Sequence, residues 1–131
     1  MKRAALISLL ALCAACKQQD PAVLIDMSGP FIVPANADKL HLEVVDWPGG
    51  TIVRGKDWCY NAAAGCDVLP PMPQGFSASV TIVESGSAHQ HVKINVELML
   101  GTAVVGLGTA TVDFAPGQTV AIEIPVTRPT F

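Results

Sequence analysis

The chain has 131 residues, of which 50% are hydrophobic and 15% charged, so it can form one domain with its own core. Its eight Lys and Arg residues are outnumbered by eleven Asp and Glu residues, which gives a formal net charge of -3. A net negative charge argues against binding to nucleic acid and against electrostatic adhesion to anionic lipid.

An apolar run at residues 4–15 follows the basic pair Lys2 and Arg3. Its twelve residues are fewer than the roughly 20 that a membrane-spanning helix needs, so we predict a secretory leader that is removed. Loss of residues 1–15 leaves 116 residues with six basic and eleven acidic side chains, a net charge of about -5. A second domain does not fit in that length.

The leader ends in Cys13-Ala14-Ala15-Cys16, which resembles the lipid-attachment signal of bacterial lipoproteins, with Cys13 where that family usually has Leu. The resemblance implies cleavage after Ala15 and acylation of Cys16. Stable anchoring needs more than one acyl chain. The diacylglycerol and the amide-linked acid that the resemblance implies meet this requirement. The alternative is an ordinary signal peptide cut after Ala15, which leaves Cys16 as a free thiol.

This resemblance also divides the chain into a signal peptide at residues 1–15, a lipidated tether at 16–21 and one domain at 22–131. Lys17, rather than Asp, follows the cysteine, which in the family goes with delivery to the outer membrane. We therefore expect the bacterial cell envelope, at the outer membrane facing the periplasm or the cell surface.

With Cys13 removed and Cys16 acylated, Cys59 and Cys66 are left as partners for each other. An oxidising compartment favours a disulfide between them, closing a short loop. A metal site is the competing interpretation, but zinc sites favour two to four residues between paired cysteines and need further ligands.

The first half of the domain predicts short strands. Residues 23–26 and 31–33 indicate one strand near a sheet edge, interrupted by Ser28-Gly29-Pro30. Residues 40–45 alternate as a half-buried strand, and Trp47-Pro48-Gly49-Gly50 turns the chain into a partner strand at 51–54. Residues 55–75 lack a regular pattern, although the cysteine pair and three prolines predict order there, with room for a short strand or helical turn.

The second half alternates more clearly, at residues 76–83, 91–99 and 120–126, and 91–99 is expected to lie centrally in its sheet. A two-residue loop at Leu100-Gly101 would pair Leu98 with Ala103 and turn Gly106 and Gly108 outward. Pro125 would also point outward, which is typical of an edge strand.

Together these patterns predict an all-β fold of about seven strands, an immunoglobulin-like or transthyretin-like sandwich. A small closed barrel is the alternative. Aromatic residues are scarce, at 5%, so the core is expected to consist of Val, Ile and Leu. About fifteen such side chains, each contributing roughly 1.5 to 3 kcal/mol, would outweigh the disulfide.

Few residues offer chemistry. His89 and His91 share one strand face and, with His41, could form a three-histidine zinc site, although solvent-facing histidines at strand surfaces are the simpler interpretation. No nucleophile stands beside an evident base, and no calcium-binding spacing is present. We therefore predict that the protein is not an enzyme and needs no cofactor.

Binding is the stronger possibility. Trp47, Trp58 and Tyr60 fall in turns or in the long loop, where they could stack on sugars or insert into a partner, or could instead cap the open end of the sandwich. The sequence predicts a cell-envelope lipoprotein with a structural or protein-interaction role, its partner an unknown envelope protein or glycan. The alternative is a carbohydrate- or peptide-binding module that uses the loop at residues 57–75.

Overall fold

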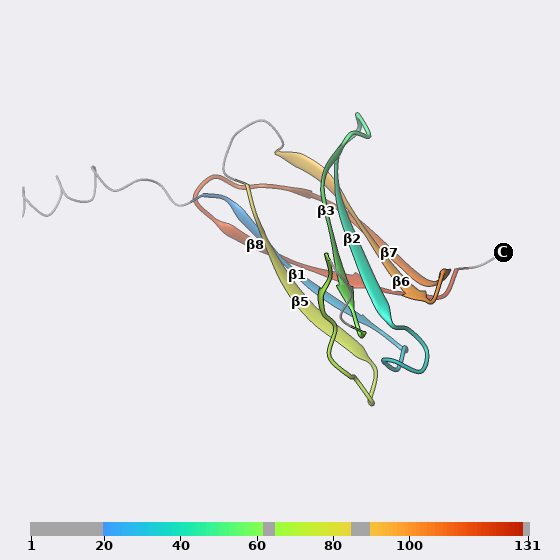
Figure 1. The fold of residues 1–131 in the computed structure, drawn as a ribbon. Coiled ribbons are helices and arrows are strands. Elements are labelled where there is room, and N and C mark those ends of the chain that lie inside the picture. The colour runs from blue at the N-terminus through green and yellow to red at the C-terminus, as the bar shows by residue number, and fades with distance from the viewer. Residues whose placement is uncertain (1–19, 62–64, 85–89, 130–131) are drawn as a thin grey trace, which may run out of the picture.

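The computed structural model of the chain describes residues 20–61, 65–84 and 90–129. These residues form eight strands and no helix, in a three-stranded and a five-stranded sheet that pack face to face (Figure 1). The predicted all-β sandwich is confirmed, with eight strands where about seven were expected. Its narrower assignment as immunoglobulin-like or transthyretin-like stays a prediction.

Some predicted features lie outside the described residues. They are the leader, Cys16 with most of its tether, and His89. The signal peptide and the lipid anchor therefore stay predictions. Within the described ranges, no helix is long and apolar enough to cross a membrane.

The three-stranded sheet has the order β5 (Phe76–Val83), β1 (Ala22–Gly29), β8 (Thr119–Pro125). Strand β1 pairs antiparallel with β5 and parallel with β8, so the prediction that it lies near a sheet edge is wrong. Gly29 ends β1 and Pro30 follows it, so the strand is not interrupted but is followed by a separate segment in which Val33 forms an isolated bridge with Met72. Strand β8 does lie at an edge, as predicted.

The five-stranded sheet has the order β4 (Asp67–Val68), β3 (Ile52–Cys59), β2 (Lys39–Asp46), β6 (His91–Leu100), β7 (Ala103–Asp113). The predicted hairpin of β2 and β3 is confirmed, and β6 lies inside the sheet as expected. Strand β3 continues past residue 54 into the segment without a regular pattern. The short strand β4 follows in the same segment.

The core is built mainly from Val, Ile and Leu side chains of both sheets, with three phenylalanines added. Strands β2 and β6 bury every second residue, as predicted, because their inner faces lie over the three-stranded sheet. The largest fully buried side chains include Phe31, Phe76, Ile25, Met27, Leu40, Ile94, Leu98 and Ile124.

The hairpin of β6 and β7 differs from the predicted one. Its loop is Gly101-Thr102, with Leu100 opposite Ala103, and Gly101 adopts a positive φ of 63°. A bulge then shifts the register, so that Leu98 lies opposite Gly106 instead of Ala103. The predicted outward orientation of Gly106 and Gly108 is therefore wrong, because the bulge turns both glycines to the core side, opposite Leu98 and Val96.

These glycines allow the two sheets to meet along one side of the sandwich. A Cβ on Gly108 would lie 2.7 Å from Ile124 Cγ2, and one on Gly106 would lie 2.8 Å from Phe31 Cζ. The main chain joins the sheets there, because the Leu107 N–H donates to Thr127 O at 2.8 Å and Leu107 O accepts from Thr127 N at 2.9 Å. We call this edge the closed side.

Cys59, at the end of β3, is bonded to Cys66, and their Cα atoms are 5.6 Å apart. The predicted disulfide is therefore present, next to the start of β4. Replacing both cysteines by serine is expected to lower the free energy of unfolding by about 2 kcal/mol, because only a short loop is released in the unfolded chain. Urea denaturation measures this loss. Wild-type protein in reducing agent should match the variant, and loss of the fold in either sample would contradict the prediction.

Candidate functional site

The three aromatic residues that the sequence singled out do not form one surface. Trp47 lies in the turn between β2 and β3, 37% exposed, with Lys93 Nζ at 4.6 Å from its ring centre. Trp58 and Tyr60 lie at the opposite end of β3, where both are half-buried and pack against the core. A stacking platform made of all three is therefore absent, although Trp58 lines a groove described below.

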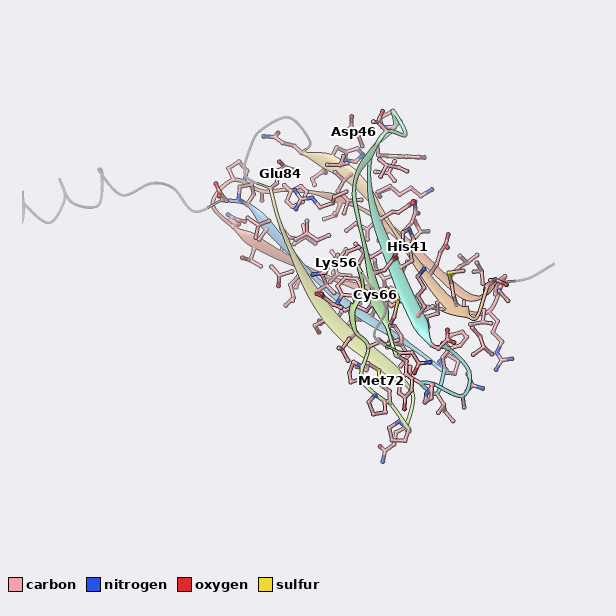
Figure 2. All side chains as sticks on the ribbon, in the orientation of Figure 1. His41, Asp46, Lys56, Cys66, Met72 and Glu84 are labelled. Atoms are coloured by element: carbon pink, nitrogen blue, oxygen red, sulfur yellow. A yellow bond between two sulfur atoms is a disulfide. The ribbon has the colours of Figure 1, made fainter. Side chains whose placement is uncertain are left out.

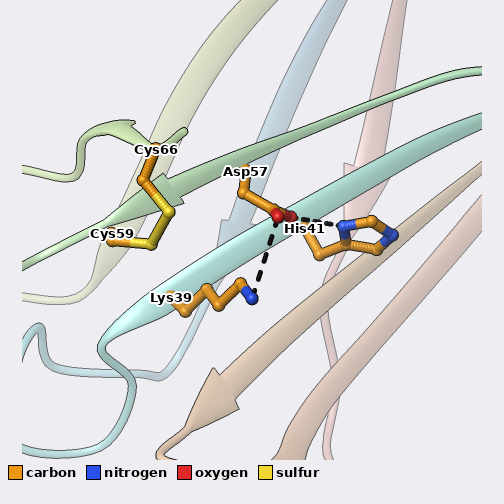
Figure 3. Close-up of a disulfide and its surroundings, with 5 residues drawn as sticks. All are labelled: Lys39, His41, Asp57, Cys59 and Cys66. Carbon is orange, nitrogen blue, oxygen red and sulfur yellow. Dashed lines mark hydrogen bonds and ion pairs between the residues drawn. A yellow bond between two sulfur atoms is a disulfide. The ribbon is translucent and has the colours of Figure 1, made fainter. Parts of the chain in front are cut away.

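A polar cluster lies on the outer face of β2 and β3, where the strand register places His41 opposite Asp57. His41 Nδ1 contacts Asp57 Oδ1 (Figure 3), and His41 Nε2 lies 3.2 Å from Glu43 Oε1. Lys39 Nζ lies 3.7 Å from Asp57 Oδ2. Burial lowers the pKa of His41, but the hydrogen bonds to Asp57 and Glu43 outweigh it, so the net pKa is raised above 6.5. The cluster thus favours an imidazolium ion held by two carboxylates.

An NMR titration of His41 tests this arrangement. In Asp57→Asn, the pKa of His41 is expected to fall, because the first of the hydrogen bonds that raise it loses its charge. Since the folded-state pKa is above the unfolded value, His41 adds stability below pH 6.5, and this contribution disappears as the pH rises through the folded pKa. Asp113→Asn, which alters the partner of His91 instead, is the control and should leave the His41 titration unchanged.

The three histidines do not meet at one point among the described residues. His41 lies opposite Glu97, six residues along β6 from His91, which corresponds to roughly 20 Å. His91 instead contacts Asp113 of β7, and His89 is outside the described ranges. In the described part of the chain, no three His, Cys, Asp or Glu side chains are placed to hold a metal ion.

A groove runs along the side of the sandwich opposite the closed side, between β5 and the strands β3 and β4. We call it the open-side groove. It consists of two hollows that share Trp58 and Val80. The apolar hollow, about 250 Å³, is lined among others by Trp58, Val68, Leu69, Met72, Ser79 and Val80. The cationic hollow, about 220 Å³, is lined among others by Leu42, Arg54, Lys56, Trp58, Thr81 and Ile82.

Arg54 and Lys56 give the second hollow its charge. They lie opposite Val44 and Leu42 of β2, so their side chains share the inner face of the sheet rather than the outer one. Lys56 Nζ lies 2.8 Å from Asp67 Oδ2 and 5.3 Å from the ring centre of Trp58. Figure 2 shows Lys56 midway between Glu84 and Met72, which mark the two ends of β5.

The main chain of β5 presents a free edge to this groove. The Glu84 N–H donates to Pro21 O at 2.9 Å, so the even-numbered residues of β5 pair with β1. The main-chain N–H and C=O groups of the odd-numbered residues point away from β1. The Ser77 N–H contacts Met72 Sδ at 3.4 Å, and Val83 O accepts from Arg54 Nη1 at 3.2 Å. Between these two contacts, the N–H and C=O groups of Ser79 and Thr81 face the groove.

Sequence analysis did not find this groove, although it named the loop at residues 57–75 that supplies part of it. Arg54 and Lys56 belong to a strand whose exposed pattern is irregular, and a cation on an inner face gives no periodic signal. The edge of β5 becomes visible only once the strand order is known, because alternation identifies a strand but not its neighbours.

Comparison of the chain with protein-family models found no match, and neither did comparisons with curated proteins and with solved structures. Among the described residues, the open-side groove and the polar cluster are two features that could bind a ligand. Of the two, the groove is concave and apolar, as binding sites usually are.

Proposed function

We propose that this protein is a non-catalytic lipoprotein of the bacterial cell envelope, anchored through Cys16, whose β-sandwich binds a protein partner in the open-side groove. The groove carries the proposal. It combines an apolar floor around Trp58 with the exposed Val68, 64% accessible, at its margin. An exposed apolar side chain that continues an apolar hollow suits a surface that a partner covers.

The position of the chain ends supports the anchored arrangement. The described chain enters the sandwich at one end and leaves it at the other (Figure 1). Pro21 lies beside Glu84 at the entry end, whereas Arg128 lies beside Phe31 at the exit end. A lipid on Cys16, only a few residues before Pro21, would hold the entry end at the membrane and leave the groove open from the side.

The anchor is tested by mass spectrometry of the protein expressed in bacteria with its own leader. We expect an N-terminal acylated Cys16 and a membrane-bound protein. Cys16→Ser should be neither acylated nor cleaved at the same position, and globomycin should block maturation of the wild type. An unmodified Cys16 in the mature wild type would contradict the anchor and favour an ordinary signal peptide.

The groove is tested by site-specific photocrosslinking in intact envelopes. A photoreactive residue at Val68 is expected to capture a partner protein, and excess Trp58→Ala protein should compete for it less well than the wild type. The same residue at Thr111, exposed on β7 away from the groove, is the matched control. Equal capture at both positions would contradict a role for the groove, and capture of glycan instead would favour a carbohydrate-binding module.

A further inference from the structure

The open-side groove lies beside β5, where the smaller sheet has room for one more strand. That sheet has three strands and the other has five, yet the main chain closes the sandwich on the side of β7. The difference in width between the two sheets therefore falls on the opposite side of the sandwich, where β3 and β4 extend beyond β5. Because β5 is an edge strand with main-chain groups directed outward, this space has hydrogen-bonding partners along one wall.

A second copy of this chain does not fit that space. Antiparallel pairing of two β5 edges about a two-fold axis would form one six-stranded sheet, with both five-stranded sheets on the same face of it. Since each larger sheet already extends past its own β5, the two extensions would collide. A single extended segment adds one strand to β5 and leaves β3 and β4 in place.

The charges of the groove indicate which side chains that segment carries. Arg54 and Lys56 have side chains 46% and 56% exposed, and none of the described residues lining the cationic hollow is acidic. Their acidic contacts, Glu84 and Asp67, lie outside the described lining. A carboxylate entering between the two cations would form charge-assisted hydrogen bonds.

Strand direction orders these features. From Ser77 to Thr81, β5 runs from the apolar hollow to the cationic one, so an antiparallel segment meets the cations first. Residues two apart on a strand point to the same face, at about 7 Å spacing. An acidic residue therefore precedes, by two positions, an apolar residue that would lie against Trp58 and Leu69.

Building on the proposed function, we propose that the open-side groove binds one extended peptide segment of a partner, paired antiparallel with β5, with an acidic residue between Arg54 and Lys56 and an apolar residue in the apolar hollow. This is strand addition at a sheet edge, in which the main chain supplies affinity and the two hollows supply selectivity. The polypeptide backbone is the recognised chemistry, so a glycan would not replace it.

A capped synthetic peptide, Thr-Thr-Glu-Thr-Leu-Thr-Val-Thr, is the probe, titrated by calorimetry into protein purified from expressing bacteria. The Thr residues at its even positions would lie opposite the outward-facing residues of β5, so N-methylation of these Thr residues should abolish binding. N-methylation of Leu and Val, whose N–H groups face away from β5, should leave it. Hydrogen exchange should show new protection at the Ser79 and Thr81 amides.

Charge selectivity is tested with a matched pair of peptides. Lys in place of the probe's Glu should weaken binding by about tenfold or more. In the double variant Arg54→Gln/Lys56→Gln, whose fold is checked by circular dichroism, this difference should shrink to about threefold or less. The variant should still bind the N-methyl-Leu peptide better than the N-methyl-Thr peptide.

Several outcomes overturn strand addition. They are no binding at millimolar peptide, equal binding of both N-methylated peptides, or protection away from β5. Crosslinking at Val68 tests the groove separately. Specific capture at Val68, together with any of these results, would refute strand addition but leave the proposed function standing. Protection of Ser79 and Thr81 without capture in envelopes would support the strand and refute the proposed partner.

Discussion

Gly108→Ala is expected to lower the free energy of unfolding by about 2 to 3 kcal/mol, an effect of overpacking at the closed side. The added Cβ would lie 2.7 Å from Ile124 Cγ2 and 2.8 Å from the main-chain oxygen of Pro125. A backbone oxygen cannot move without disturbing β8, so the two sheets would have to separate locally. Urea denaturation measures the loss as a lower midpoint.

Gly55→Ala is the matched control, because Gly55 is also a strand glycine. Its added Cβ would lie 3.6 Å from Leu42 O, an ordinary contact, in an exposed part of β3. Alanine there is expected to be neutral or stabilising by up to about 1 kcal/mol. If both variants were equally stable, Gly108 would face solvent, and the β6–β7 register described above would be wrong.

Leu98→Ala is expected to cost about 2 to 5 kcal/mol, more than loss of the disulfide. Leu98 is 0% exposed and lies between Leu40 of β2 and Gly106 of β7. Gly106, its partner on β7, has no side chain that could move into the cavity. Thermal or urea denaturation would show the loss.

Leu100→Ala, on the same strand, is the control for that substitution. Leu100 is 40% exposed, so its truncation is expected to change stability by no more than about 0.5 kcal/mol. Similar losses in the two variants would mean that β6 does not bury the predicted face. If the disulfide-free variant lost more stability than Leu98→Ala, the disulfide would contribute more to the stability of the domain than the packing of this core side chain.

The sequence predicted best those strands that bury one face over the other sheet. Strands β2, β5 and β6 alternate between apolar and polar residues because each has one side in the core and one in water. Strand β3 was predicted only to residue 54, because Lys56 occupies an inner-face position beyond the cover of β5. Its length depends on the width of the opposite sheet, which local pattern does not contain.

Register and strand order were harder to predict for the same reason. The β6–β7 hairpin was assigned the wrong loop, and no feature of the composition other than the glycines marks the bulge between the Met99–Val104 and Leu98–Gly106 pairs. Strand β1 was placed near an edge because the predicted strand included Pro30 as an interruption, although its neighbours come from residues 76–83 and 119–125. The candidate groove combines β3 with β5, so it could not be predicted before these pairings were known.

The parallel pairing of β1 with β8 joins the first and last strands of the domain. A growing chain that has not yet produced residues 119–125 has nothing to place along one edge of β1, so its smaller sheet cannot be completed. Contacts of such long sequence separation also form slowly. The native smaller sheet therefore forms only after residues 119–125 have been synthesised, which would leave the earlier part of the chain incompletely folded during the translocation that the proposed anchor requires.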